Sequence, residues 1–309
     1  MFKYSLDNKR YHTFNYFLKN KFGGKVIKVP LDINSPCPNE ISGGCIYCAH
    51  KSKANIIIET DDIIKQFNHT KNILLKKWPK SIFIPYFQSG TNTYLPVDKV
   101  KPLIDKLLCE KNVVGIAIAT RPDCINDQWY KYLSDLNKKT FLTIEIGLQT
   151  CNENTLKFIN RNHTVTCVTD TINKLKRNNI FTVVHIINGL PHETKEDMLN
   201  TIKYLNRQNI DAIKIHMLYI DKDTKLAKIY QKEKFHVLTK EEYIDIICQQ
   251  LEYLNPNIVI ERITGDPIKD DLIAPKWLLK KCQLLNDIDK EMVKRNIYQG
   301  DKTGIKYLK

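Results

Sequence analysis

Short runs of β-branched and apolar residues alternate with helical patterns about six times between residues 26 and 220, and this alternation constrains the fold more than any other feature. The runs are continuously apolar, as in parallel strands that are covered on both faces. The expected strands are Val26–Val29, Ile82–Tyr86, Val113–Ile118, Phe141–Ile146, Thr182–Ile187 and Ile213–Leu218. Repeated strand–helix units predict an α/β fold with a parallel sheet, either open and doubly wound or curved into a partial barrel.

Residues suited to chemistry follow the ends of these runs almost every time. Three cysteines follow the first run, Gln88–Tyr94 follow the second, and Arg121 and Asp123 follow the third. Gln149 ends the fourth and His216 lies in the sixth. In barrel enzymes, catalytic groups collect at the carboxyl ends of the strands. We therefore predict a partial (β/α)6 TIM-like barrel facing one shared cavity.

Three parts are expected along the chain: a packing segment at 1–25, the partial barrel at 26–220, and a C-terminal α/β extension at 221–309 that covers the barrel. The extension should hold a helix over 239–254 with Thr239 as its N-cap, and a short strand at Ile258–Ile260. Apolar residues spaced by three and four between Leu278 and Met292 predict a further amphipathic helix.

Composition limits the class of protein. The chain has 309 residues and a formal net charge of +14, which suits a polyanionic partner such as RNA, although a coding bias toward lysine would also produce it. We expect neither a membrane span nor a secretory signal. Nine cysteines, an odd number with only three clustered, argue against a disulfide framework and for a reducing cytoplasm. The other six are expected to be buried or half-buried.

The three clustered cysteines are Cys37, Cys45 and Cys48, with seven and then two residues between them. Gly43 and Gly44 allow a tight turn, so that three thiolates can converge on a soft metal or an iron–sulfur cluster. No fourth cysteine follows at conventional spacing, which would leave one iron of a cubane open to a small ligand. A zinc site closed by His50, or a redox pair of Cys45 and Cys48, remain the alternatives.

Motifs over nearly the whole chain resemble a known family. The matching stretches are the cysteine loop, Phe22–Val26, Gln88–Tyr94, Thr120–Cys124, Glu145–Thr150, Asn160–His163, Gly189–Pro191 and Gly265–Trp277. They are similar to the radical S-adenosylmethionine (SAM) superfamily, and within it to the YhcC/YtqA (MnmL-like) group, related to the Elp3 and coproporphyrinogen-oxidase branches. The gap of seven residues after Cys37 is longer than the three common in the superfamily.

The resemblance implies a 4Fe-4S cluster on Cys37, Cys45 and Cys48, with SAM chelating the open iron. An electron from the cluster would cleave SAM to methionine and a 5′-deoxyadenosyl radical, which abstracts a substrate hydrogen. The implied SAM contacts are Gly90 and Thr91 for the amino group, Gln149 for the ribose, Arg161 for the methionyl carboxylate, and Gly189, Pro191 and Tyr47 for the adenine. Glu145 is either a further SAM contact or a structural charge inside the barrel. His185 stands where the coproporphyrinogen-oxidase branch has an acidic ribose contact; it is either a feature of the group or a buried histidine.

The resemblance also implies a substrate, since the group includes an enzyme associated with wobble-uridine modification in tRNA. The expected reaction takes 5-carboxymethylaminomethyluridine to 5-aminomethyluridine in the anticodon stem-loop, with flavodoxin or ferredoxin as electron donor. Candidate substrate residues are Arg121, His216, Arg262 and Asp266, with Asp270 near the same entrance. Each has a structural alternative: Arg121 could pair with Asp123, and His216 could be a core histidine. His163 is expected to be a loop partner, and Trp277 a packing residue.

Two other functions remain open at this point. One is a radical SAM enzyme that acts on a small metabolite or a tetrapyrrole. The other is a non-catalytic RNA-binding module with a structural zinc. The sequence does not indicate the oligomeric state.

Overall fold

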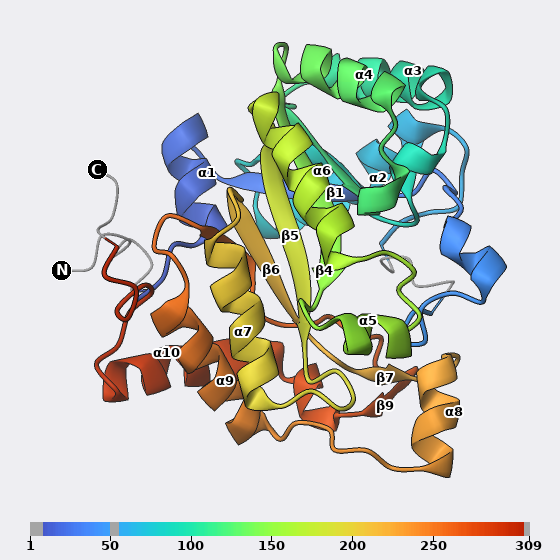
Figure 1. Ribbon diagram of the computed structural model, residues 1–309. Coiled ribbons are helices and arrows are strands. Elements are labelled where there is room, and N and C mark those ends of the chain that lie inside the picture. Colours follow the sequence, from blue (N-terminus) through green and yellow to red (C-terminus); the bar gives the residue numbers. More distant parts are fainter. Residues whose placement is uncertain (1–8, 50–55, 306–309) are drawn as a thin grey trace.

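In the computed structural model, which describes residues 9–49 and 56–305, seven parallel strands form one curved sheet (Figure 1). Their spatial order follows the chain, β1-β2-β3-β4-β5-β6-β8. The strands are β1 Val26–Leu31, β2 Ile82–Phe87, β3 Gly115–Thr120, β4 Phe141–Gln149, β5 Phe181–Asn188, β6 Ala212–Met217 and β8 Val259–Arg262. The predicted partial barrel is confirmed. The strand expected at Ile258–Ile260 is β8, which pairs with β6 and extends the sheet by one strand.

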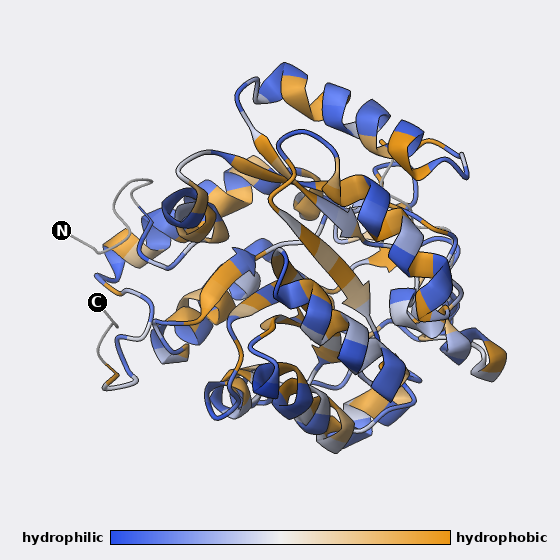
Figure 2. Cartoon of the chain, turned by 90° about the horizontal axis from the view of Figure 1, so that it is seen from above, coloured by the Kyte–Doolittle hydropathy of each residue, from blue (hydrophilic) through white to orange (hydrophobic). Residues whose placement is uncertain are grey.

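Helices cover the outer face of the sheet, one after almost every strand. They are α2 Ile63–Lys77, α3 Val97–Leu108, α4 Asp127–Asn137, α5 Glu153–Phe158, α6 Val165–Arg177, α7 Lys195–Asn206, α8 Lys225–Lys232, α9 Lys240–Tyr253 and α10 Lys281–Lys294. Side-chain caps start most of them, and Thr239 caps α9 as expected, through a capping box with Glu242. Figure 2 shows the result, with apolar strands inside and hydrophilic helix faces outside. Helix α8 was not expected from the sequence.

The N-terminal ends of the strands are closed by aromatic side chains. Helix α1 (Phe14–Phe22) packs against both edge strands, β1 and β8. Phe17 lies 5.0 Å from the ring of Phe181, and Phe22 lies 5.6 Å from the ring of Phe141, measured between centroids. This apolar plug leaves the carboxyl ends as the open end of the barrel. The division into segments 1–25, 26–220 and 221–309 stays a prediction.

The barrel interior changes character along its axis. Alternate residues of the strands point inward, and those near the plug, such as Val26, Ile84 and Val183, are apolar and buried. At the next inward positions toward the carboxyl ends of the strands lie Lys28 and Glu145, which are charged. The strands are therefore continuously apolar only on the helix-covered face and at the plug.

A small second sheet lies beyond the main one. Strand β7 (Ile220–Asp221), which begins three residues after β6 ends, pairs antiparallel with β9 (Leu272–Ala274). No helix in the described ranges is long and apolar enough to cross a membrane. All nine cysteines are free thiols, but the expectation that the six outside the motif are buried is wrong for Cys109 and Cys282, which are exposed.

Candidate active site

The cysteine loop follows β1 and is shaped by its own backbone. Cys37 precedes a short 3-10 helix, η2 (Pro38–Ser42), which ends at Gly43. Gly43 and Gly44 have φ of 88° and 72°, a conformation that favours glycine, so the chain reverses before Cys45. Cys45 is buried, Cys37 is half-buried and Cys48 is exposed.

Asparagines fasten this loop to the segment after α5. Asn39 donates from Nδ2 to the backbone oxygen of Asn160 at 2.8 Å and contacts Cys45 Sγ at 3.3 Å. Asn160 donates in turn to the backbone oxygen of Gly44 at 2.7 Å, and Asn162 donates to Asn39 Oδ1 at 2.6 Å. Helix α8 closes the other side, where the backbone N–H of Leu226 donates to the backbone oxygen of Ile46 in the loop at 2.8 Å. The position of Cys45 is therefore held by side-chain amides from two distant parts of the chain.

A cavity of about 530 Å³ opens at the carboxyl ends of the strands, above the interior charges. All three motif cysteines line it, together with most residues predicted to contact SAM or substrate: Tyr47, Gly90, Thr91, Arg121, Glu145, Gln149, Arg161, His216 and Arg262. Residues scattered over more than two hundred positions of sequence thus meet around one space. The prediction that the strand-end motifs face a shared cavity holds for these residues.

Arg161 and Gln149 lie together over Gly147 in β4. Arg161 donates from Nη2 to the backbone oxygen of Gly147 at 3.1 Å, and its Nη1 lies 3.6 Å from Cys45 Sγ. A Cβ at Gly147 would come within 2.4 Å of Gln149 Nε2 and 2.6 Å of Arg161 Nη2. A side chain at this position would force both of these groups to move. Burial alone would lower the pKa of Arg161, but the adjacent Tyr47 and Cys45 raise it, so the guanidinium stays charged.

Gly90 and Thr91 form the wall after β2. Gly90 has φ of 72°, and a Cβ there would lie 2.0 Å from the backbone oxygen of Ser35. Ser35 donates from Oγ to the backbone oxygen of Thr91 at 2.6 Å, which binds this loop to the segment leading into the cysteine motif. The glycine therefore permits a close approach of two backbones beside the cavity.

Arg121 is paired with Asp123, which is the structural role given above as the alternative to a substrate contact. Its Nε and Nη2 donate to the two carboxylate oxygens of Asp123 at 3.0 and 2.9 Å, and Nη2 also reaches the backbone oxygen of Arg161 at 3.0 Å. Two guanidinium donors beside the cavity nevertheless remain buried without a partner in the described part of the chain, Arg121 Nη1 and Arg161 Nε. Unpaired buried donors are costly, and an anionic ligand in the cavity would satisfy them.

The floor of the cavity is a network of buried charges. Both oxygens of Glu145 are engaged: Oε1 by Lys28 at 2.5 Å, and Oε2 by Tyr86 at 2.7 Å, His185 at 2.8 Å and Lys214. Burial alone would raise the pKa of Glu145, but Lys214 and Lys28 hold it well below its usual range. The geometry favours the structural alternative for this side chain, since its acceptors are taken.

The same lysines also bind a second carboxylate, Glu261 in β8. Lys28 Nζ lies 2.7 Å and Lys214 Nζ 2.8 Å from Glu261 Oε1. The network therefore pairs two cations with two anions that come from four strands. Three of its members, Lys28, Lys214 and Glu261, were missed from the sequence, although single charged residues inside otherwise apolar strands are a signal that could have found them.

Two histidines stand above this floor. The ring of His185 is fixed by Glu145 and lies 5.3 Å from the ring of His216, which lines the cavity wall. Burial, then His185 and Arg262, lower the pKa of His216 well below its usual value, so its imidazole is neutral. Arg262 ends β8 beside them and pairs with Asp266 at 3.0 Å.

The remaining candidates lie outside the cavity lining. Gly189 and Pro191 are buried in the turn after β5, so their contact with adenine stays a prediction. Asp266 points to Lys281 and Arg262. His163 contacts the backbone oxygen of Gly147 at 3.1 Å and acts as the expected loop partner.

The spacing of the thiols bears on what the site can hold. Three thiolates that share one tetrahedral zinc ion lie about 3.8 Å apart, given Zn–S bonds of about 2.3 Å. No group of three Cys, His, Asp or Glu within residues 9–49 and 56–305 is placed to hold a metal ion, and His50 lies outside those ranges. The three thiols of Cys37, Cys45 and Cys48 line one cavity, and thiolates are the ligands that an iron–sulfur cluster takes in proteins.

Comparisons with known proteins agree with this site. A radical SAM superfamily model matches residues 39–205, and a radical SAM C-terminal domain model matches residues 210–294. The chain is 41% identical over 304 residues to YtqA of Bacillus subtilis, covering 97% of this chain and 94% of that protein. It is 27% identical over 305 residues to YhcC of Escherichia coli, covering 97% of each.

The fold is also shared with a solved structure. The archaeal Elp3 of Methanocaldococcus infernus, lacking its N-terminus, superposes with a TM-score of 0.69 at 17% identity, over 89% of this chain and 64% of that one. Family membership implies the use of SAM and an iron–sulfur cluster. The matched models and the relatives that align along nearly the whole length show that the chain belongs to the radical SAM superfamily of enzymes.

Proposed function

We propose that this radical SAM enzyme modifies the wobble uridine of tRNA, converting 5-carboxymethylaminomethyluridine to 5-aminomethyluridine. The observation that carries the proposal is the part of the cavity wall formed by β6 and β8. It combines cationic Arg262 with the neutral imidazole of His216 above a paired Lys214. A cation suits the carboxylate that the substrate has and the product lacks, and a neutral imidazole can both donate and accept a hydrogen bond.

Other residues of the cavity lining would hold the cofactors. Cys37, Cys45 and Cys48 would ligate a 4Fe-4S cluster, which when bound supplies the electron that cleaves SAM and starts radical chemistry. Arg161 and Arg121 offer the two unpaired buried donors to an anionic group such as a carboxylate. Gln149 and the backbone at Gly90 face the same space.

The chain's own residues would position the bound ligands and shield them from solvent. Arg161 is held by Gly147 and Cys45, so its guanidinium is fixed before any ligand arrives. The plug of phenylalanines at the other end of the barrel closes the interior, which leaves the carboxyl-end mouth as the entrance for a nucleotide. The cavity volume of about 530 Å³ lies in the range of small-molecule sites, so only a small part of an RNA, such as an extruded base, can enter it.

An RNA substrate also agrees with the charge of the whole chain. The formal net charge of +14 would attract the phosphate backbone of an anticodon stem-loop, whose unpaired bases can be splayed into a pocket. We place the enzyme in a reducing cytoplasm, in agreement with its nine free thiols, and expect flavodoxin or ferredoxin as the electron donor.

The test is mass spectrometry of wobble nucleosides. The tRNA carrying 5-carboxymethylaminomethyluridine is incubated with anaerobically reconstituted enzyme, SAM and a reductant. We expect 5-aminomethyluridine to appear together with 5′-deoxyadenosine, and both to vanish with Cys45→Ala. With Arg262→Gln, 5′-deoxyadenosine should persist while the modified nucleoside falls at least about tenfold. An unchanged nucleoside pattern with active wild-type enzyme would refute the substrate. Full activity of the Gln149→Ala and Arg161→Ala double variant would refute the assigned SAM contacts.

A further inference from the structure

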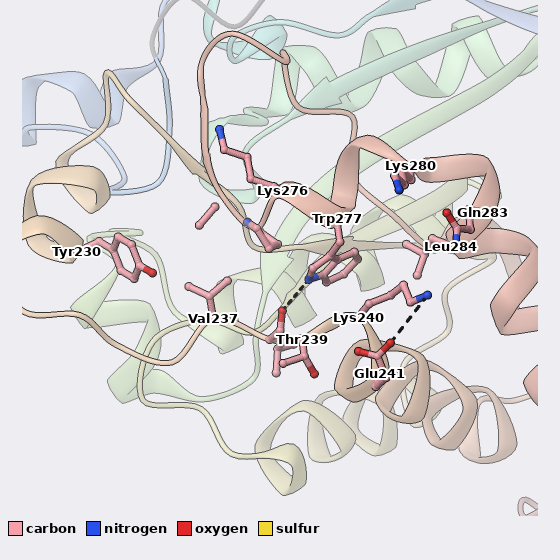
Figure 3. A pocket seen from close by; sticks show the side chains of 13 residues that line it. Tyr230, Val237, Thr239, Lys240, Glu241, Lys276, Trp277, Lys280, Gln283 and Leu284 are labelled. Carbon is pink, nitrogen blue, oxygen red and sulfur yellow. Dashed lines mark hydrogen bonds and ion pairs between the residues drawn. The ribbon is translucent and has the colours of Figure 1, made fainter.

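A second pocket, of about 680 Å³, lies outside the cavity and shares no lining residue with it (Figure 3). Four segments surround this outer pocket: α8 through Tyr230, residues 237–241 before and at the start of α9, residues 274–277 after β9, and the beginning of α10. Neither the cavity of the barrel nor the proposed reaction uses it.

The outer pocket is close to the catalytic end of the barrel. Strand β9, whose end forms one wall, pairs with β7, and β7 begins three residues after β6, the strand of His216. Helix α8, which supplies another wall, donates from the backbone of Leu226 to Ile46 in the cysteine loop at 2.8 Å. The elements that form the pocket are therefore joined directly to the elements that form the cavity, at the same edge of the sheet.

The walls of the outer pocket suit a flat aromatic ring. Trp277 stands in its middle (Figure 3), half-buried, with Nε1 donating to the backbone oxygen of Leu238 at 3.1 Å. On one side the indole contacts the buried ring of Tyr243, 5.8 Å away between centroids. An indole fixed in this way loses little conformational entropy when another ring stacks on it. Aliphatic side chains of Val237 and Leu284 line the pocket around it.

The rim of the outer pocket is cationic. Three lysines and one glutamate line it, Lys240, Lys276, Lys280 and Glu241, which gives a local charge of +2. Lys240 is paired with Asp287 at 3.0 Å, and Lys276 donates to the backbone oxygen of Leu272. Lys280 is exposed, and its ammonium has no partner in the part of the chain that the structure describes. An apolar pocket with cations at its edge complements a nucleotide, because the base can lie inside the pocket and the phosphate can lie at its edge.

We propose that the outer pocket binds an unpaired nucleotide of the RNA substrate, next to the one that enters the cavity. The base stacks on Trp277, and the backbone phosphates face Lys276 and Lys280. This inference rests on the proposed function in one respect, namely that the substrate is RNA. The alternative occupant is an acidic electron-donor protein; a concave aromatic pocket favours the nucleotide, because a protein surface would need a matching protruding side chain.

The first experiment measures binding of a synthetic anticodon stem-loop to the reconstituted holoenzyme by fluorescence anisotropy over a range of salt. Lys276→Ala with Lys280→Ala should weaken binding and reduce the slope of log Kd against log salt by about 1.4, the value for two single-strand phosphate contacts. The matched control, Lys131→Ala with Lys139→Ala at exposed sites on and just after α4, should leave the slope unchanged. Trp277→Leu should weaken binding about tenfold and leave the slope unchanged.

The second experiment needs no variant and so does not depend on correct folding of one. A stem-loop with 4-thiouridine beside the wobble position is irradiated on the wild-type holoenzyme, and the crosslinked peptide is identified by mass spectrometry. We expect a peptide that contains residues 274–284. In turnover, the lysine double variant should raise KM for tRNA and keep kcat at saturation.

The outcomes separate this inference from the proposed function. Crosslinks confined to other peptides, or an unchanged salt slope in the double variant, overturn the inference while 5-aminomethyluridine still forms. Slower reduction by flavodoxin in the double variant, with RNA affinity unchanged, overturns it in favour of a protein partner. If the wild-type enzyme neither binds the stem-loop nor changes its nucleosides, the proposed function fails, and the inference fails with it.

Discussion

Replacing Lys214 by methionine tests the network of charges below the cavity most directly. Lys214 is 5% exposed, and its ammonium contacts Glu261 at 2.8 Å as well as Glu145. With Lys28, the native interior holds two cations and two carboxylates. The variant holds one cation and two carboxylates, while methionine keeps most of the volume of the lysine stem.

The expected loss of folding stability follows from that imbalance of charge. Breaking a buried ion pair by removing one partner costs about 3–5 kcal/mol, since the remaining charge stays in the interior uncompensated. The total stability of a domain is about 5–15 kcal/mol, so a large part of it should be lost. The control is Lys101→Met on α3, where Lys101 and Asp105 are both 51% exposed. An exposed pair at that spacing contributes about 0.3–0.5 kcal/mol.

The assay is urea unfolding of the reduced, cluster-free protein, followed by circular dichroism. A second change, Glu261→Gln, restores the charge balance in the Lys214→Met background and should recover more than half of the lost stability. Equal losses for Lys214→Met and Lys101→Met, or a further loss when Glu261→Gln is added, would show that the buried charges are not coupled as described.

The loss should also depend on pH. Burial alone would raise the pKa of Glu145, but Lys214 and Lys28 hold it well below its usual range in the wild type. The stability from this group is therefore present above the unfolded pKa of about 4.3 and is lost as the pH falls below it. In Lys214→Met, one of the two carboxylates can take up a proton in place of the lost lysine charge. The difference in the free energy of unfolding between this variant and the wild type should therefore become smaller between pH 7 and pH 5.

Three further predictions concern the cavity and its surroundings. Gly147→Ala should lower SAM affinity at least about tenfold by calorimetry, because its Cβ would lie 2.6 Å from Arg161 Nη2 and displace that side chain. Asn39→Ala should lower the iron retained after anaerobic gel filtration by about half or more, because the amide that contacts Cys45 Sγ and fastens the loop is lost. Burial raises the pKa of Glu193 from 4.5 to about 7, so the folded protein holds this proton more tightly than the unfolded chain; its contribution to stability should be lost as the pH rises from about 4.5 to about 7.

Each of these predictions has a control. Gly24→Ala, with no atom within 4 Å of the added Cβ, should leave SAM affinity unchanged. Asn137→Ala removes an amide that bonds backbone oxygens far from the cavity, and iron retention should match wild type. Glu193→Gln should flatten the dependence of the urea midpoint on pH over that window. A wild-type midpoint that rises across the window while the Glu193→Gln midpoint stays level would contradict the raised pKa.

Much of the fold could be predicted from local pattern. The six apolar runs between Val26 and Leu218 all became strands within a few residues, because a β-branched run covered on both faces has few other stable structures. Helix α8 was missed because it is short and follows a polar turn, and its contact with the cysteine loop, rather than its propensity, keeps it in place.

The candidate site was predictable in part for the same reason. Loops after parallel strands share one edge, so the cysteines, Gly90, Gln149 and Arg161 could be expected to meet there. The pairing of Glu145 with Lys28 and Lys214 could not, since a lysine inside an apolar strand marks a buried charge but does not show which carboxylate it meets across the barrel. Asn39 was missed because most of its contacts are with Asn160 and Asn162, more than a hundred residues away.

The sequence by itself determined the order of strands and helices, the three converging thiols and the glycines that let backbones approach, since each depends on conformations available to a few neighbouring residues. Only the tertiary structure decided that Lys28 and Lys214 neutralise Glu145 and Glu261, and that His216 is neutral. Those properties arise when the sheet curves and brings β1, β4, β6 and β8 around one dry interior, where the energy of a charge depends on its distance from the others rather than on its place in the chain.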